Sequence, residues 1–75
     1  MKPLAPHLER VAYLVSLGLS NRAMAERLGL TEGTVAAYVR DARKLVSARN
    51  RFELGTWYLR KTGVLAEDTP IFGPS

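Results

Sequence analysis

Apolar residues along this chain recur at spacings of three and four, which is the period of helices that bury one face. The pattern is clear from Leu8 to Val15, and it predicts a first helix from Pro6 to about Leu17. The same spacing predicts three more helices, at residues 21–28, 31 to about 46, and 51 to about 62. The fold class that follows is all-α.

The residues between these stretches suit the ends of helices. Polar residues that commonly N-cap helices precede three of them: Ser20, Thr31 and Asn50. Glycines suited to a left-handed backbone follow three of them: Gly18, Gly29 and Gly63. Residues 64–75 have no helical period, so we expect a flexible tail there. The sequence therefore predicts one four-helix domain at 1–63, with a helix-turn-helix unit at 20–44, and a short irregular C-terminal tail at 64–75.

The third predicted helix has two unlike sides. At about 100° per residue, its core stripe falls within about 60° of the helical wheel and contains Val35, Val39, Ala42 and Val46. The opposite arc carries small residues first and basic residues later: Gly33, Ala36, Ala37, Arg40, Arg43, Lys44 and Ser47. Asp41 is the only acidic residue near that arc. Such a distribution is typical of a helix that lies in a groove of DNA.

The fourth predicted helix is apolar on two sides. One side holds Leu54, Trp57 and Tyr58, and the other side holds Phe52, Gly55, Thr56 and Leu59. A helix this short needs only one apolar side to pack on its own core. The second side therefore indicates contact with another helix.

Charge is unevenly distributed along the chain. Residues 1–62 hold all eleven Lys and Arg with five acids, a formal charge of +6, and residues 63–75 hold two acids and no base. A basic body with a short acidic tail indicates a polyanionic partner such as nucleic acid. Ordinary solubility charge is the alternative interpretation.

Several classes of function find no support in the composition. The chain has no cysteine, hence no disulfide and no thiolate metal site, which suits the reducing cytoplasm. No apolar run approaches the ~20 residues that cross a membrane, and the N-terminus lacks the apolar region of a signal peptide. The single histidine, His7, sits near one end. We expect a cytoplasmic protein that is not an enzyme and that has no cofactor, no metal and no membrane partner.

Over roughly Leu4 to Leu59, the chain resembles the DNA-binding domain of the LuxR/GerE family of bacterial regulators. The most specific signal is Gly-Leu-Ser-Asn at 18–21, followed by Thr-Val at 34–35. The matching residues fall in place without gaps: Leu4, Val11, Leu14, Gly18, Leu19, Ser20, Asn21, Met24, Ala25, Leu28, Leu30, Thr34, Val35, Val39, Arg51, Glu53 and Leu54. The chain departs from the family pattern at four places. Residues 7–10 stand where the family has alternating acids and arginines, and Ala36 stands where it often has a lysine. Tyr38 replaces a common histidine, and Ser47 replaces a glycine.

The resemblance implies roles for individual residues. It implies that the major groove is contacted by Ala36, Ala37 and Arg40. It implies that phosphates are contacted by Asn21, Thr34, Tyr38, and Arg43 or Lys44. Arg22 joins this set because the exposed start of a helix attracts phosphate. The chain resembles free-standing members of the family. The resemblance also implies a homodimer through the fourth helix, at Phe52, Gly55, Thr56 and Leu59.

Several of these residues have a structural alternative. Thr34 is either a phosphate ligand or a helix-start hydroxyl, and Tyr38 is either a phosphate donor or a packing residue. Arg51 is either a DNA contact or a structural residue that pairs across to the first helix, where Glu9 is available. Arg40 is the best candidate to read a base, because arginine forks onto O6 and N7 of guanine for roughly 1–3 kcal/mol of discrimination. The two alanines either press on thymine methyl groups or simply favour the helix.

The function indicated by these features is sequence-specific DNA binding and transcription regulation by a homodimer, with the helix at 31–46 in the major groove of double-stranded DNA. Two alternatives stay open. One is a phage or accessory helix-turn-helix protein that serves packaging, recombination or a sigma-like role. The other is a protein-interaction module that binds RNA polymerase or another regulator. Bacterial or phage origin also stays open.

Overall fold

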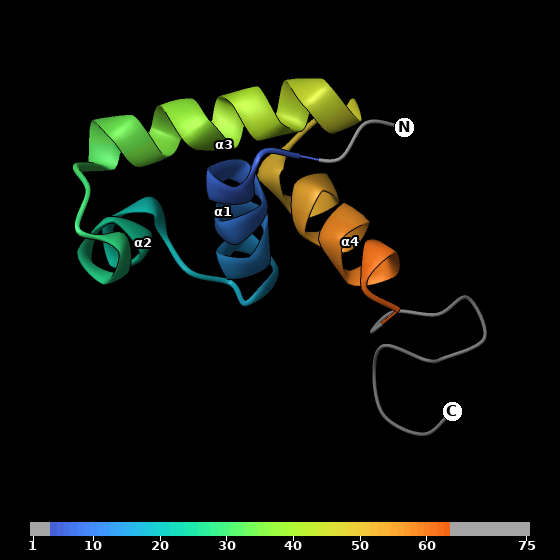
Figure 1. Cartoon of the computed structure of the whole chain (residues 1–75), viewed down its shortest axis with the longest axis horizontal. Helices are drawn as coiled ribbons and strands as arrows, with labels where there is room; N and C mark the ends of the chain where they lie inside the picture. The colour runs from blue at the N-terminus through green and yellow to red at the C-terminus, as the bar shows by residue number, and fades with distance from the viewer. Residues whose placement is uncertain (1–3, 64–75) are drawn as a thin grey trace.

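The computed structural model describes residues 4–63, and these contain all four predicted helices (Figure 1). Their bounds are α1 Pro6–Ser16, α2 Asn21–Leu28, α3 Glu32–Val46 and α4 Arg51–Lys61. The described residues form no strand, which confirms the predicted all-α, four-helix fold. The first and fourth helices each end one residue earlier than predicted. The predicted tail at 64–75 lies outside the described residues.

Side-chain caps begin three of the four helices, as predicted. In each case the capping oxygen accepts the backbone N–H of the residue three positions later, at 3.1 Å for Ser20, 3.1 Å for Thr31 and 2.9 Å for Asn50. Each bond satisfies a donor that the helix start leaves unpaired and stabilises the helix by about 1 kcal/mol. The helix ends of α2, α3 and α4 are therefore encoded locally.

The turns between the helices require a left-handed backbone. Gly18 and Gly29 supply it after α1 and α2, with φ of 86° and 70°. Ser47 takes the same conformation after α3, with φ of 60°, at the place where the LuxR/GerE pattern has glycine. The turn is closed by the N–H of Ala48, which donates to the carbonyl of Arg43 at 2.8 Å. The exchange of glycine for serine thus leaves the predicted path of the chain unchanged.

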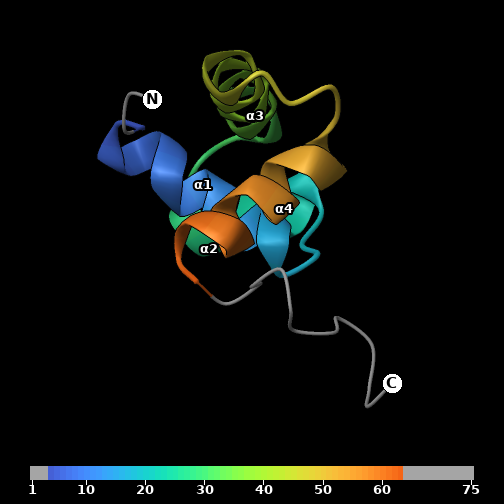
Figure 2. The same ribbon diagram turned by 90° about the vertical axis from the view of Figure 1, so that its right-hand side faces the viewer.

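The first helix, α1, lies at the centre of the domain. Figures 1 and 2 show α3 along one side of the molecule, with the other three helices together beneath it. Helix α1 packs against both α3 and α4, and α2 packs against α3. Together they bury one apolar cluster: Leu4, Leu8, Val11, Ala12, Leu14, Val15, Met24, Ala25, Val35, Val39, Ala42 and Leu54. The predicted core stripe of α3 is thereby confirmed, with Val46 half-buried at its edge.

Helices α1 and α4 approach each other closely at Gly55, which is buried. A Cβ atom at this position would lie 3.2 Å from Cα and 3.4 Å from the backbone N of Ser16, and 3.5 Å from Cγ1 of Val15. The glycine therefore serves close packing, and no turn is involved. The resemblance implies that Gly55 lies in a dimer interface. In the structure Gly55 is buried against α1 of the same chain and also lines a groove beside α4, so its place in a dimer interface stays a prediction.

Gly55→Ala should lower the free energy of unfolding by up to about 2 kcal/mol. The new methyl group comes too close to the backbone of Ser16, which costs about 1–3 kcal/mol, and the roughly 1 kcal/mol that alanine gains over glycine in a helix offsets part of this cost. Urea denaturation followed by circular dichroism measures the change. Gly33→Ala is the matched control, since its nearest atom is 4.0 Å away, and it should gain up to about 1 kcal/mol. Equal stabilisation by both substitutions would contradict the close packing at Gly55.

Candidate nucleic-acid interface

The outer side of α3 is not covered by the other helices (Figures 1 and 2). Its exposed residues are Gly33, Ala36, Arg40, Asp41 and Lys44, with Ala37 half-buried among them. The helix has 15 residues, so it is about 22 Å long and roughly 10–12 Å wide with its side chains. The major groove of B-DNA, at about 12 Å, admits such a helix.

Arg40 extends from this face with its side chain 63% exposed. Its Nε lies 3.7 Å from Oδ1 of Asp41, which makes an ion pair but is too long for a hydrogen bond. A pair this exposed contributes little energy, and because it involves Nε, the terminal Nη groups of the guanidinium stay available for a base edge. Asp41 is not among the predicted site residues, and its adjacency to Arg40 in the sequence is the signal that points to it.

At the start of α3, the hydroxyl groups of Thr31 and Thr34 form a pair. The Thr31 hydroxyl donates to Oγ1 of Thr34 at 2.9 Å while it accepts the backbone N–H of Thr34. The hydroxyl of Thr34 therefore acts as an acceptor inside the turn and keeps its own proton for an outside partner. The two interpretations of Thr34, helix-start hydroxyl and phosphate ligand, are compatible with each other.

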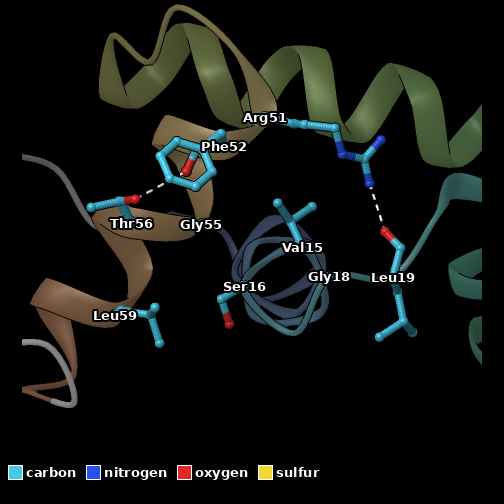
Figure 3. Close-up of a pocket in the computed structure, with 9 residues that line it drawn as sticks. All are labelled: Val15, Ser16, Gly18, Leu19, Arg51, Phe52, Gly55, Thr56 and Leu59. Atoms are coloured by element: carbon cyan, nitrogen blue, oxygen red, sulfur yellow. Dashed lines mark hydrogen bonds between the residues drawn. The ribbon is translucent and has the colours of Figure 1, made fainter. Parts of the chain in front are cut away.

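Arg51 connects the start of α4 to the start of α2. Its Nη1 donates to Oδ1 of Asn21 at 2.8 Å. Its Nη2 donates to the carbonyl of Leu19, also at 2.8 Å (Figure 3). The structural role considered for Arg51 is therefore present, but the expected partner, Glu9, is wrong, because Glu9 pairs with Lys61 near the other end of α4. Asn21 accepts through its oxygen, which leaves its amide N–H groups to meet a phosphate.

Two predicted phosphate contacts make other contacts within the domain. Nη2 of Arg43 donates to the carbonyl of Arg49 in the connection between α3 and α4. Nε of Arg43 is buried and has no hydrogen-bond partner among residues 4–63. The ring of Tyr38 lies edge-on to that of His7, with centroids 4.8 Å apart, so packing accounts for the ring. Phosphate binding by Arg43 and Tyr38 therefore stays a prediction.

Lys44 and Arg22 differ from these two residues because they face solvent. Lys44 is exposed near the C-terminal end of α3. The Arg22 side chain is 78% exposed in the first turn of α2, and its Nε lies 3.8 Å from Oε2 of Glu26. Both side chains are free of the α3–α4 connection and can turn toward an external anion.

A shallow groove of about 240 Å³ lies between the end of α1 and the second apolar side of α4 (Figure 3). Val15, Leu19 and Leu59 contribute apolar side chains to it, and Gly55 lies between them. Phe52 stands at its edge with 78% of its surface exposed. All four residues predicted for a dimer interface therefore line this open groove, and Gly55 is the buried one among them.

The described part of the chain contains no group of three or more His, Cys, Asp or Glu residues that could hold a metal ion. Within that same part, no helix combines the length and the apolar character needed to cross a membrane.

Comparison with known proteins finds two response regulators. The chain is 45% identical over 51 residues to the two-component response regulator PprB of Pseudomonas aeruginosa, a match that covers 68% of this chain and 18% of PprB. It is 33% identical over 54 residues to the nitrate/nitrite response regulator protein NarL of Escherichia coli, which covers 72% of this chain and 25% of NarL. Both matches fall in the C-terminal region of the relatives.

This chain thus spans a quarter or less of the length of these curated relatives. The relatives agree with the LuxR/GerE-type helix-turn-helix domain that the sequence resembles. No model of a protein family matches the chain. No solved structure matches it either.

Arg51→Leu should lower the free energy of unfolding by about 2 kcal/mol, because it removes two hydrogen bonds from a charged donor and leaves the Leu19 carbonyl without this partner. The stability of Arg51→Lys should lie between those of wild type and Arg51→Leu, because one ammonium group cannot reproduce the planar fork of the guanidinium. Thermal unfolding followed by circular dichroism measures both. Arg22→Leu is the matched control, because its ion pair is exposed, and should stay within about 0.5 kcal/mol of wild type. A wild-type stability for Arg51→Leu would contradict this role.

Proposed function

We propose that this chain is a LuxR/GerE-type domain that binds double-stranded DNA and regulates transcription, with α3 in the major groove. The observation that carries the proposal is the outer face of α3, which is small in its first half, basic in its second half, and uncovered by the other helices. The response-regulator relatives support it. The formal charge of +6 on residues 1–62 supports it as well, since a basic domain attracts a polyanion.

In this proposal Arg40 reads sequence. A guanidinium forks onto O6 and N7 of guanine in the major groove, and the exposed side chain of Arg40 suits that geometry. Ala36 and Ala37 lie one turn earlier and carry only methyl groups, so the helix can enter deeply there and touch thymine methyl groups. The family lysine that Ala36 replaces is absent, so discrimination by a long side chain depends largely on Arg40.

Contacts to phosphate would fix the position of α3 without reading sequence. We assign them first to groups that face outward: the side chains of Arg22 and Lys44, the hydroxyl of Thr34 and the amide of Asn21. For Tyr38 the hydroxyl is the relevant group, because the ring packs against His7. Arg43 is the weakest member of the set, because its guanidinium already donates to the Arg49 carbonyl.

We further propose that two copies associate through α4. The support is the open apolar groove beside α4, at whose edge Phe52 exposes 78% of its surface. A large aromatic side chain at such a groove gains free energy when a second copy covers it. A dimer would present two α3 helices to adjacent half-sites about one helical turn apart. RNA polymerase or another regulator would be a further partner of such a domain.

Selection of bound sites from a random DNA pool tests the DNA-binding proposal, and Arg40→Ala tests its key residue. Wild type should enrich a preferred site, and Arg40→Ala should reduce that preference by 1–3 kcal/mol, roughly 5- to 150-fold, while salt-sensitive binding to random duplex persists. Arg60→Ala removes the same charge from the last turn of α4 and should keep the preference. An unchanged preference in Arg40→Ala would exclude base reading by Arg40.

A protein-interaction module is the alternative that the exposed Phe52 favours. A salt titration on random duplex separates it from the main proposal, because several phosphate contacts make binding fall steeply as salt rises. Absence of binding at low salt would favour the interaction module.

Leu59→Glu should abolish the dimer, because it places a charge in an apolar groove where a second copy would remove its water. Sedimentation at micromolar concentration measures the oligomeric state. Leu30→Glu is the control: Leu30 is also a partly exposed leucine, in the α2–α3 turn at the far end of the molecule from α4 (Figure 1), and that variant should remain dimeric. A wild-type chain that is already monomeric would overturn the dimer proposal.

A further inference from the structure

One acidic side chain lies on the face of α3 that we assign to DNA. At about 100° per residue, Arg40 lies about 50° to one side of the line through Ala37 and Lys44, and Asp41 lies about 50° to the other side. The two side chains are 63% and 52% exposed, and their Nε and Oδ1 atoms are 3.7 Å apart. Asp41 therefore shares the outward surface with Arg40 and would meet the same DNA.

The carboxylate of Asp41 acts against every phosphate that approaches this face. Ala37 and Tyr38, one turn before Asp41, are uncharged and do not offset its charge. The nearest lysine on α3, Lys44, lies one turn after it. Phosphate attraction dominates binding to random DNA and carries no sequence information. Asp41 should therefore weaken binding to all sequences alike.

At a preferred site the same carboxylate has a second effect. When Arg40 donates both Nη groups to O6 and N7 of a guanine, its Nε edge stays on the side of Asp41. The carboxylate then limits the rotation of the guanidinium and keeps its plane available for the fork. While Arg40 stays in this pair, the arginine balances the charge of Asp41, so the repulsion is partly offset in this arrangement.

We infer that Asp41 is a specificity-determining residue that positions Arg40 on one base pair and raises the ratio of specific to random binding. The inference rests on the proposed function, since it assigns a partner to the base-reading arginine. Specificity of this kind comes from disfavouring the wrong complex as well as favouring the right one.

Asp41→Asn tests the inference, because it keeps the shape of the side chain and removes its charge. The probes are a duplex that wild type enriches from a random pool and a scrambled duplex of the same composition. Affinity for the scrambled duplex should rise about two- to fivefold, and the ratio of the two affinities should fall by a similar factor. In a fresh selection, Asp41→Asn should lose preference at the same base pair that Arg40→Ala affects.

Three further variants separate positioning from simple charge. Glu26→Gln removes one negative charge from another exposed ion pair, that with Arg22, and should leave the affinity ratio unchanged. Asp41→Glu keeps the charge and should recover part of the ratio lost in Asp41→Asn. In the Arg40→Ala background, Asp41→Asn should change the ratio no further, because the two residues act as a unit.

The outcomes distinguish this inference from the proposed function. In one outcome wild type enriches a site, and the ratio of preferred to scrambled affinity for Asp41→Asn equals or exceeds that of wild type. This outcome would overturn the role of Asp41 and leave DNA binding intact. Wild type that binds no duplex at low salt, or binds without any sequence preference, would overturn both. A lower ratio for Asp41→Asn with an unchanged preference at the Arg40 base pair would exclude positioning.

Discussion

The packing of α1 against both α3 and α4 is the constraint on which the rest of this domain depends. Domains of this size bury only about 60% of their unfolded surface, so the central helix must contact several partners at once. Here α1 meets α3 on one side and α4 on another, and Gly55 lets α4 come within close contact of Ser16. The direction of α3, and hence the face it turns outward, follows from this arrangement.

The basic residues of the chain divide into two groups that the net charge does not distinguish. Some hold the fold together through contacts within the domain: Arg43, Arg51 and Lys61. Others extend into solvent with at most weak, exposed ion pairs: Arg22, Arg40 and Lys44. The electrostatic attraction of a polyanion depends on the whole charge, whereas close contacts by basic side chains depend mainly on the second group. The surface available for recognition is therefore smaller than a formal charge of +6 suggests.

Much of the fold could be predicted from the sequence because its signals are local. The caps at Ser20, Thr31 and Asn50 act three residues away, and the core stripe of α3 follows from one helical period. The partner of Arg51 could not be predicted, because it combines a side chain 30 residues away with a backbone carbonyl, and no sequence pattern marks a carbonyl as an acceptor.

The candidate site shows the same division between local and long-range information. The outward position of Arg40 follows from the wheel, and the structure agrees with it. The burial of Gly55 and the inward contact of Arg43 depend on how α4 and its connection return to the other helices. Such contacts require the angles between helices, which the period of apolar residues does not contain.

The left-handed backbone at Ser47 restricts how this chain can diverge. A position with φ of 60° accepts glycine, asparagine, aspartate or serine at modest cost and rejects β-branched side chains. Exposed positions on α3 carry no such restriction, so homologous chains can acquire new side chains there while the α3–α4 junction stays within a short set of amino acids. The domain therefore separates the part of its sequence that can drift from the part that preserves its geometry.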